Sequence, residues 1–433
     1  MSALDGTTAE IVAITGLGVL TALGESLSSL WDALIAGRSG IGPISSFNAA
    51  DFICNQAALV VEPSPDNLGV SPRESRVMTL PPLILLQTGQ TACLHSCLKE
   101  TGFPSDRIAF FAAMGMIDPH YNDLKSAIFK SGVSFPPSET TTPKPSPTVD
   151  YQRFLGGAYQ EIYPLWPLAM LNNVGFCLAA NQLGITGENA VFSADADAGV
   201  MALAEAVESL RFQRADIALV GGAGEKLLPM HLARMQLLYE LSPLGTCHPF
   251  ALSRTGTVPG EGGAVLVLEP IRQAQARGVK PLAIITGWGF GGGLDRIDAQ
   301  EQAMRTAMER AGCSTEDISL LMPHGDGTPH GDEDELTAVA RVFKSRQAPL
   351  PIYATKASIG HLRAGAAIVD ALVATLILQQ RTLPPMTEPP DNTKGVVWKT
   401  AEAGGLPFEG LRVLINAQGR AGSCASFILE RGG

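Results

Sequence analysis

The sequence predicts an α/β protein made of two related halves, and three observations support this fold class. Two β-type openings resemble each other, IVAITGLG at 11–18 and LAIITGWG at 282–289. Each half also holds a later apolar strand that ends in glycine, IALVGGAG at 217–224 and VLINAQG at 413–419. Continuous apolar runs such as AVLVLE at 264–269 are typical of sheets that helices bury on both faces. This pattern indicates an internal duplication about a pseudo-dyad.

The other elements follow in chain order. The first opening leads into a helical segment at 27–37, and the second leads into another at 298–312. Residues 131–150 are rich in Pro, Ser and Thr, and strand and helix signals resume on both sides, so we interpret them as a long surface loop. Residues 191–210 (VFSADADAGVMALAEAVESL) begin like a strand, turn through small residues and continue as an amphipathic helix.

Composition narrows the class of protein. Hydrophobic residues make up 45% of the 433 residues and charged residues 17%, which favours a well-buried core over disorder. The net charge is −11 without a Lys/Arg block, so we expect no nucleic-acid partner. Seven cysteines without a CxxC pair indicate a reduced, cytoplasmic protein and no metal site. We see neither a signal peptide nor an apolar run of the roughly 20 residues that a bilayer span needs, so we expect no membrane association.

The turn within 191–210 has the shape of a catalytic elbow. Elbows between a strand and a helix commonly hold a nucleophile, which the helix N-terminus aims. Here the elbow reads Asp195-Ala196-Asp197-Ala198-Gly199, with no Ser, Cys or Thr at its apex.

Three further segments carry candidate chemistry. They are HPFALSRTGTVPGEGGAVLVLE, PHGDGTPHGDEDELTAVARVF with His324, and ATKASIGHLRAGAAIVDALVATLILQQ with Lys356 and His361. A single histidine beside glycines often only caps a helix. Two such histidines in one half, together with a lysine and a Glu-Gly-Gly hinge, favour a catalytic site.

Taken in order, these segments resemble the β-ketoacyl-carrier-protein synthases, the condensing branch of the thiolase-like fold. The resemblance covers nearly the whole chain, from ITGLGVLTALGESLSSLWDALIAGRSGI onward, and HGDGTPxGDxxE is similar to the family's HGTGTPxGDxxE. It implies a thiolase-like αβαβα layered fold of two pseudo-dyad-related halves. We divide them as residues 1–270 and 271–433.

The resemblance also implies a role for each matching residue. The family uses a Cys at the elbow for acyl transfer, and Ala196 falls at that position. The family's two histidines stabilise the enolate formed when malonyl-carrier protein loses CO2, and His324 and His361 match them. Lys356 and Glu335 fall where the family places a supporting Lys and Glu. Because a methyl group cannot attack a thioester, we expect no covalent acyl-enzyme at Ala196.

Other departures from the family surround this position. Arg420 occupies the place of the Phe that gates the family's acyl pocket, and Asp195 and Asp197 flank Ala196. Asp326 replaces a Thr, and Arg363 is an unexpected cation beside His361. A guanidinium next to an apolar tunnel is costly to bury alone, so we expect Arg420 to pair with Asp195 or Asp197 and to plug the pocket.

The function that we favour is that of a non-condensing subunit, similar to the chain-length factors of type II polyketide synthases. Such proteins lack the Cys, pair with a competent ketosynthase and line the far end of its acyl tunnel in polyketide or polyene synthesis. The matching segment here is AFFAAMGMIDPHYND, with Met114, Met116 and Ile117 expected to face the tunnel. Many chain-length factors also lose both histidines, whereas this chain keeps them.

Two alternatives remain open. Decarboxylation of malonyl-carrier protein needs an oxyanion site and no nucleophile, and His324 and His361 favour it. Priming decarboxylases of the family carry Gln at the elbow, however, where this chain has Ala. The other alternative is an ordinary 3-oxoacyl-carrier-protein synthase that bears a Cys-to-Ala change, although the unusual neighbours Asp195, Asp197 and Arg420 argue against it.

The expected partners follow from the resemblance. We expect a heterodimer with a catalytic ketosynthase, and an acyl carrier protein that docks mainly on that ketosynthase. No metal and no dissociable cofactor is expected, because phosphopantetheine arrives on the carrier protein.

Overall fold

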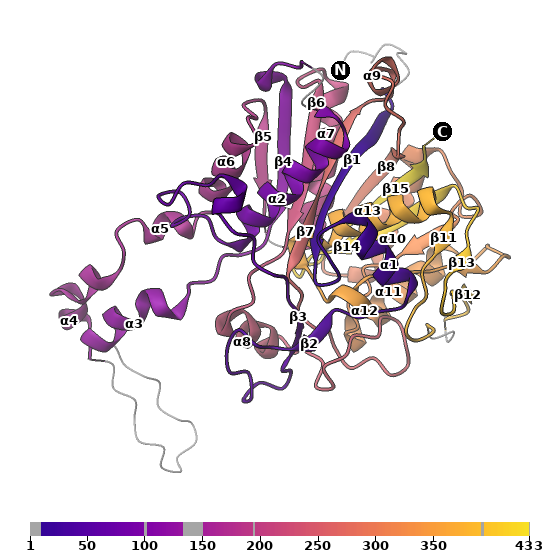
Figure 1. Ribbon diagram of the computed structural model, residues 1–433. Coiled ribbons are helices and arrows are strands. Elements are labelled where there is room, and N and C mark those ends of the chain that lie inside the picture. Colours follow the sequence, from indigo (N-terminus) through magenta and orange to yellow (C-terminus); the bar gives the residue numbers. More distant parts are fainter. Residues whose placement is uncertain (1–9, 99–101, 133–149, 194, 391–393, 433) are drawn as a thin grey trace.

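The computed structural model describes residues 10–98, 102–132, 150–193, 195–390 and 394–432. At its centre is a nine-stranded sheet, in which the first strands of the two predicted halves are neighbours (Figure 1). In spatial order the strands are β5 (Asn189–Phe192), β4 (Ile108–Met114), β6 (Ile217–Ala223), β7 (Gly262–Pro270), β1 (Val12–Thr21), β8 (Ala283–Gly292), β15 (Ser423–Arg431), β14 (Arg412–Gln418) and β9 (Leu320–Met322).

The two halves of this sheet mirror each other in topology. In the first half, β4 is parallel to β6, and β6, β7 and β1 are successively antiparallel. In the second half, β9 is parallel to β14, and β14, β15 and β8 are successively antiparallel. The halves join where Val12–Ile14 of β1 pair with Ala283–Ile285 of β8. The duplication that the two similar openings predict is therefore present in the strand order.

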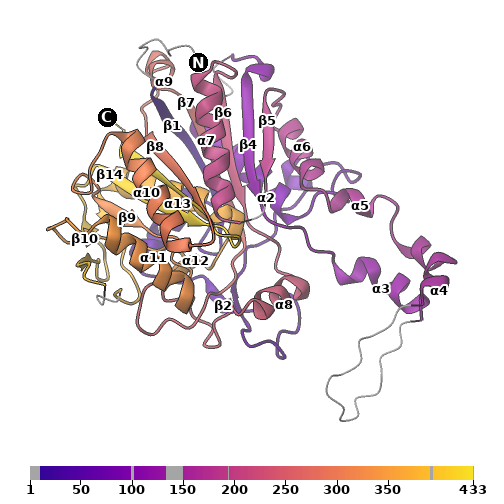
Figure 2. The ribbon, with the colours of Figure 1, turned by 180° about the vertical axis from the view of Figure 1, so that it is seen from behind.

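Helices cover both outer faces of the half-sheets and fill the space between them (Figures 1 and 2). Helix α2 packs on the first half-sheet and α10 on the second, whereas α7 and α13 contact strands of both halves. This is the predicted αβαβα layering. The helices are α1 (Leu27–Ile35), α2 (Leu80–His95), α3 (Tyr121–Lys130), α4 (Tyr151–Leu155), α5 (Trp166–Ala169), α6 (Asn172–Gln182), α7 (Asp197–Arg211), α8 (Pro229–Leu237), α9 (Ile271–Ala276), α10 (Arg296–Ala311), α11 (Pro329–Val342), α12 (Lys356–Ile359) and α13 (Ala366–Gln380).

The glycines of the two similar openings have the same structural purpose. A Cβ on Gly18 of β1 would lie 2.0 Å from the carbonyl oxygen of Thr88 in α2. A Cβ on Gly289 of β8 would lie 2.2 Å from the carbonyl oxygen of Ala303 in α10. Each outer helix therefore packs directly on the backbone of its strand, which only glycine permits.

Helix α13 and the turn before it are long and apolar enough to cross a membrane by length and composition. Within the segment Arg363–Gln380, however, 89% of the residues are buried inside the protein. It is therefore the central core helix, packed against both half-sheets.

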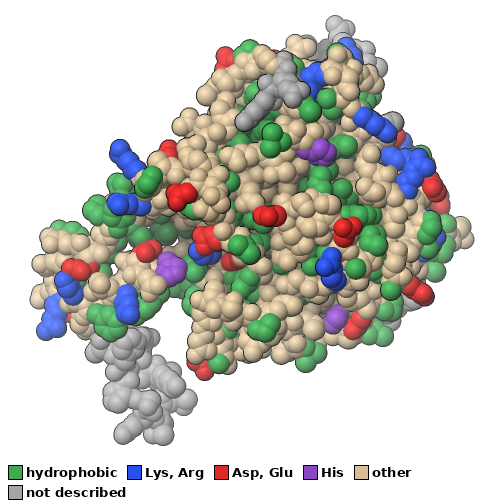
Figure 3. Space-filling model, viewed as in Figure 1, with side chains coloured by type: hydrophobic (Ala, Val, Ile, Leu, Met, Phe, Trp, Pro, Cys, Tyr) green, Lys and Arg blue, Asp and Glu red, His purple; other side chains and the backbone are tan. Residues whose placement is uncertain are grey.

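An arm formed by α3, α4 and α5 extends away from the body of the molecule (Figures 1 and 2). Hydrophobic side chains are exposed along it (Figure 3). They include Phe129, Tyr151 and Leu155, which are 64%, 74% and 70% exposed. Most of the loop predicted at 131–150 lies outside the described residues. The remaining short strands form three two-stranded sheets: β2 (Ile41–Pro43) with β3 (Gln56–Ala58), β10 (Leu350–Pro351) with β12 (Trp398–Lys399), and β11 (Thr382–Leu383) with β13 (Leu406–Pro407).

Candidate active-site cavity

A cavity of about 500 Å³ lies where the two halves meet. The first half contributes Asp195 and Glu240 to its wall, and the second half contributes His324, His361 and the loop after β14. The turns that carry these side chains follow β5, α8, β9, α12 and β14. Segments far apart in the sequence therefore converge on one site, as the motif order predicts.

Helix α7 begins beside this cavity. Ala196 is its N-cap, with φ −66° and ψ −30°, and its side chain makes no capping hydrogen bond. The methyl group is 1% exposed and packs in the main hydrophobic cluster. Gly199, one turn on, allows α7 to approach α13, because a Cβ there would lie 2.9 Å from that of Ala367. The residue that begins α7 therefore offers no nucleophilic atom.

The two histidines pack against each other in the wall of the cavity. Their ring centroids are 5.2 Å apart and their planes meet at 77°. The backbone N–H of Gln418 donates to Nδ1 of His324, and that of Arg363 donates to Nδ1 of His361, each at 3.3 Å. A ring nitrogen that accepts a hydrogen bond carries no proton, so each neutral imidazole bears its proton on Nε2. The site therefore presents two N–H donors suited to an oxyanion.

Both histidines are held neutral by their surroundings. Burial lowers the pKa of His324 well below its ordinary value, and the positive charges of Lys356 and Arg363 lower it further. Burial and the same two cations also lower the pKa of His361 well below its ordinary value. Neutral imidazoles can donate hydrogen bonds at physiological pH without supplying a positive charge.

Glu335 fixes the backbone that carries His324. Its carboxylate is fully buried and accepts hydrogen bonds from the backbone N–H groups of His324 and Gly325, both at 2.9 Å, and from Nδ2 of Asn416 at 3.0 Å. Burial raises its pKa, and these hydrogen bonds partly offset that effect. Glu335 therefore lies where the sequence predicts a supporting carboxylate, with its side chain turned to the backbone.

Lys356 supports the same turn from the other side. Its Nζ donates to the carbonyl oxygen of His324 and lies 3.8 Å from Oδ2 of Asp370 in α13. Thr355 donates to the other carboxylate oxygen of Asp370. Because Lys356 and Asp370 are both buried, each charge depends on the other.

Four charged side chains form a compact cluster beside Ala196, which we call the ion-pair quartet: Asp195, Glu240, Arg363 and Arg420. Arg363 pairs with Glu240 and lies 3.7 Å from Asp195. Arg420 places Nε 3.1 Å from Glu240 and 3.6 Å from Asp195, and its backbone N–H donates to Asp195 at 3.2 Å. Two cations and two anions therefore balance each other in a largely buried place.

The quartet agrees with one part of the Arg420 prediction and corrects another. Arg420 does contact Asp195, but Asp197 turns away and hydrogen-bonds Ser423, and burial raises its pKa. The stronger partner is Glu240, which follows α8. No motif marked Glu240, so the sequence offered no signal for it. Arg420 also does not fill the cavity, because about 500 Å³ remain open beside its guanidinium.

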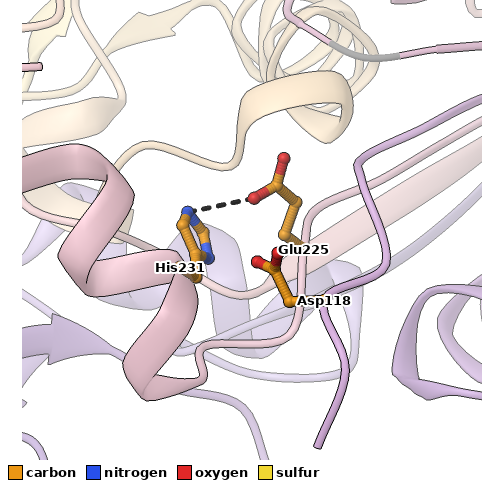
Figure 4. A group of neighbouring side chains, drawn as sticks. All are labelled: Asp118, Glu225 and His231. Atoms are coloured by element: carbon orange, nitrogen blue, oxygen red, sulfur yellow. Dashed lines mark ion pairs between the residues drawn. The ribbon is translucent and has the colours of Figure 1, made fainter. Parts of the chain in front are cut away.

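A second charged cluster adjoins the quartet. Asp118, Glu225 and His231 bring carboxylate and imidazole atoms within 4.8 Å of one another, and Nε2 of His231 lies 3.1 Å from Glu225 (Figure 4). Such a group resembles a metal site, but Arg234 already pairs with both carboxylates, bonding both oxygens of Asp118 at 2.8 and 3.0 Å and also Glu225. Burial and the cations Arg363 and Arg234 lower the pKa of His231 to about 3. A guanidinium therefore supplies the positive charge that these carboxylates need.

The three residues predicted to face the tunnel lie in two different places in the structure. Met116 and Ile117 line a second cavity of about 230 Å³, whose other wall includes Tyr163 and Trp166 from the arm. Met114, in contrast, is the last residue of β4, is fully buried and packs in the core under α2. Met114 therefore does not line this cavity, and the tunnel-facing role of the three residues stays a prediction.

The cysteines offer no substitute nucleophile near Ala196 within the described residues. Cys177 is exposed on α6, away from the cavity wall. Cys424 is buried in β15, and burial raises the pKa of its thiol to about 12. Only the thiolate is a nucleophile, so Cys424 is unreactive.

Comparison with known proteins identifies the family. Residues 9–274 match the N-terminal domain of beta-ketoacyl synthases, and residues 290–388 match the C-terminal domain. Nodulation protein E of Rhizobium leguminosarum bv. trifolii is 28% identical over 385 residues, covering 86% of this chain and 88% of the relative. The 3-oxoacyl-[acyl-carrier-protein] synthase 2 of Coxiella burnetii is 24% identical, covering 97% and 98% of the two chains.

Two solved structures share the fold closely. One is the ishigamide ketosynthase/chain length factor, with a TM-score of 0.83, 24% identity and coverage of 98% of this chain and 100% of that one. The other is a type II polyketide synthase ketosynthase in complex with its acyl-carrier protein, with a TM-score of 0.80, 19% identity and coverage of 98% and 100%.

The layered sheet and the paired histidines define a protein of the thiolase-like ketosynthase fold. The chain belongs to the beta-ketoacyl synthase family.

Proposed function

We propose that this chain is a non-condensing ketosynthase-like subunit, a chain-length factor, that pairs with a catalytic ketosynthase in type II polyketide or polyene synthesis. The observation that carries the proposal is Ala196 at the start of α7, where the family's motif places its nucleophilic Cys. An alanine there rules out acyl transfer through a covalent thioester. One role that such a ketosynthase fold can still perform is to shape the cavity of a partner that has the thiol.

The ion-pair quartet supports the same conclusion. Arg363 and Glu240 line the cavity beside the start of α7, and their side chains are only 4% and 17% exposed. Separating a buried ion pair to admit a hydrocarbon leaves uncompensated charges in an apolar place. The quartet therefore favours a chain that does not bind an acyl group at its own elbow.

Two surface features of the chain support an interaction with a partner subunit. Strand β5 is at the edge of the nine-stranded sheet, so its outer backbone groups are available to a strand from another chain. The arm of α3, α4 and α5 exposes Phe129, Tyr151 and Leu155, and exposed apolar surface of this kind marks a protein interface. The cavity lined by Met116 and Ile117 adjoins the arm, where it would meet the partner's tunnel.

The experiment that tests the proposal is reconstitution. The chain is incubated with malonyl-carrier protein alone, and then with a cysteine-bearing ketosynthase added. The proposal expects no product from the chain alone and a polyketide or polyene from the pair. Substituting Ile117→Trp should shorten the product of the pair, while Phe290→Ala, an exposed change on β8, should leave its length unchanged. Product from the chain alone would contradict the proposal.

A second function, decarboxylation of malonyl-carrier protein, is favoured by the two Nε2–H donors of His324 and His361. Stabilising an enolate needs such donors and no nucleophile. The same incubation discriminates the two functions, because a decarboxylase would form acetyl-carrier protein and CO2 without any partner. Loss of that activity in His324→Ala and His361→Ala variants would assign it to this cavity.

A further inference from the structure

The segment between β4 and α3 lines the second cavity with Met116 and Ile117. Its backbone is held on both sides of these two side chains. The backbone N–H of Met116 donates to Oε1 of Glu225 at 3.2 Å. Both carboxylate oxygens of Asp118 accept from Nη1 of Arg234, at 2.8 and 3.0 Å. The part of the segment that lines the cavity therefore lies between two anchored points.

Arg234 joins the two anchors to each other. The carboxylates of Asp118 and Glu225 lie within 4.8 Å of one another, where two negative charges repel unless a cation balances them (Figure 4). Arg234 pairs with both, and the side chains of Arg234, Asp118 and Glu225 are only 21%, 7% and 3% exposed. The fork of a guanidinium suits two carboxylates at once better than the single ammonium of a lysine does. Removing Arg234 therefore loosens both anchors together.

Helix α8 gives Arg234 a firm base. Leu232 and Met235, its near neighbours along this helix, are fully buried in a hydrophobic cluster. The loop after β4 also approaches Glu225 closely, because a Cβ on Gly115 would lie 2.2 Å from Cγ of Glu225. The cavity segment is therefore held against a rigid part of the chain, and its position depends on the contacts of Glu225 and Arg234.

A buried group of ion pairs is suited to fixing a position. The attraction between two buried charges only partly repays the cost of removing them from water, so well-packed apolar residues often give equal or greater stability. One use of buried ion pairs in other proteins is to specify a single arrangement of the chain. The contacts of Arg234 fit this use, because they join a loop that lines a cavity to the body of the molecule.

We propose that Arg234 is a positioning residue for the second cavity. It fixes the backbone that carries Met116 and Ile117, and it thereby sets how far a chain that grows on the partner extends into the cavity. The inference rests on the proposed function, in which this cavity meets the partner's tunnel. Arg234 acts through the cavity wall and contacts no reacting atom, so its effect is on the length of the product.

Hydrogen exchange followed by mass spectrometry tests the anchoring in this chain alone. In Arg234→Met, the peptide that contains Met116 should exchange about tenfold faster or more, because the hydrogen bond to Glu225 is loosened. Peptides from the core helix α13 should exchange as in the parent chain. Arg234→Lys should give an intermediate rate, since it keeps the charge and loses the fork. The matched control is Arg305→Met, which removes an exposed ion pair with Glu301 on α10 and should exchange like the parent chain.

Analysis of the products of the reconstituted pair tests the effect on the cavity. The parent chain and Arg305→Met should each give one main product length. Arg234→Met should give a broader range of lengths at a similar total yield, because the wall of the cavity is no longer held in one place. Arg234→Lys should restore most of the parent distribution.

Faster exchange throughout the chain in Arg234→Met would show that Arg234 acts on overall stability, and it would overturn the proposal. An unchanged product length in a variant whose cavity segment exchanges faster would overturn it too. A parent pair that forms no product would refute the proposed function instead, and the exchange experiment would still decide whether Arg234 positions the segment. Circular dichroism verifies folding, and Arg234→Lys provides both measurements if Arg234→Met does not fold.

Discussion

At the residue scale, the neutral histidines make the stability of the fold depend on pH. Burial lowers the pKa of His324 and His361 in the folded chain well below the value of 6.5 that applies when the chain is unfolded. Below about pH 6.5 the unfolded chain therefore takes up protons that the folded chain does not, and stability falls as the pH falls. Each histidine contributes a slope of up to about 1.4 kcal/mol per pH unit.

This dependence can be tested by measuring the free energy of urea unfolding of the parent chain and two variants between about pH 7 and pH 5. His361→Gln should lose less stability than the parent chain on acidification, by about 1 to 2 kcal/mol over that interval, because one buried imidazole is gone. His330→Gln, at an exposed position on α11, should follow the parent chain. Parallel curves for all three proteins would show that His361 titrates normally.

A second prediction concerns the buried pair of Lys356 and Asp370. Lys356→Met removes the cation and leaves the Asp370 carboxylate buried with Thr355 as its remaining partner, which should cost about 3 to 5 kcal/mol. Combining it with Asp370→Asn removes the stranded charge and should recover part of that loss. Denaturant unfolding of the single and the double variant measures both losses of stability. Equal destabilisation in the two would contradict the pairing.

At the scale of elements, the fold depends on glycines that let outer helices approach the strands. Gly289→Ala would drive a methyl group against the backbone of α10, with 2.2 Å to the carbonyl oxygen of Ala303. We expect a loss of about 1 to 3 kcal/mol or more. Gly292→Ala lies on the same strand with nothing within 4 Å, so it should be nearly neutral. Similar melting temperatures for both variants would refute this account of the ITGLG and ITGWG repeat.

At the same scale, the sequence predicted the arrangement of the elements more completely than the contacts within the site. The repeated strand openings and the four motifs in order predicted the layered fold. They also predicted that Ala196, His324 and His361 lie in the same region, because the topology determines where motifs at the ends of elements meet. Glu240 was not predicted, since ion pairs join residues that no local pattern connects. Met114 differs from Met116 and Ile117 because it is the last residue of β4 and is buried in the core, whereas the other two follow the strand and line the second cavity.

At the scale of the whole molecule, the exposed edge of β5 and the apolar arm predict assembly. Light scattering after size-exclusion chromatography should show that the chain forms a 1:1 complex with its catalytic ketosynthase. Introducing two charges on the arm, Phe129→Asp with Leu155→Asp, should weaken that complex while leaving the circular dichroism spectrum unchanged. Leu294→Asp, a fully exposed position outside the arm, is the control. Undiminished assembly of the arm variant would place the interface elsewhere.

The division of the chain at residue 270, the cytoplasmic location and the role of a carrier protein remain predictions at this scale. The boundary at 270 falls between β7 and α9, where the chain leaves the first half-sheet.

The most direct test of the central claim, that this chain is non-condensing, is the intact mass of the chain after incubation with an acyl-carrier protein and the catalytic ketosynthase. The account predicts that the ketosynthase gains the mass of the acyl group while this chain gains none, because Ala196 provides no atom to which it can be attached. An acyl adduct on this chain, with elongation of a primer in the absence of the ketosynthase, would contradict it.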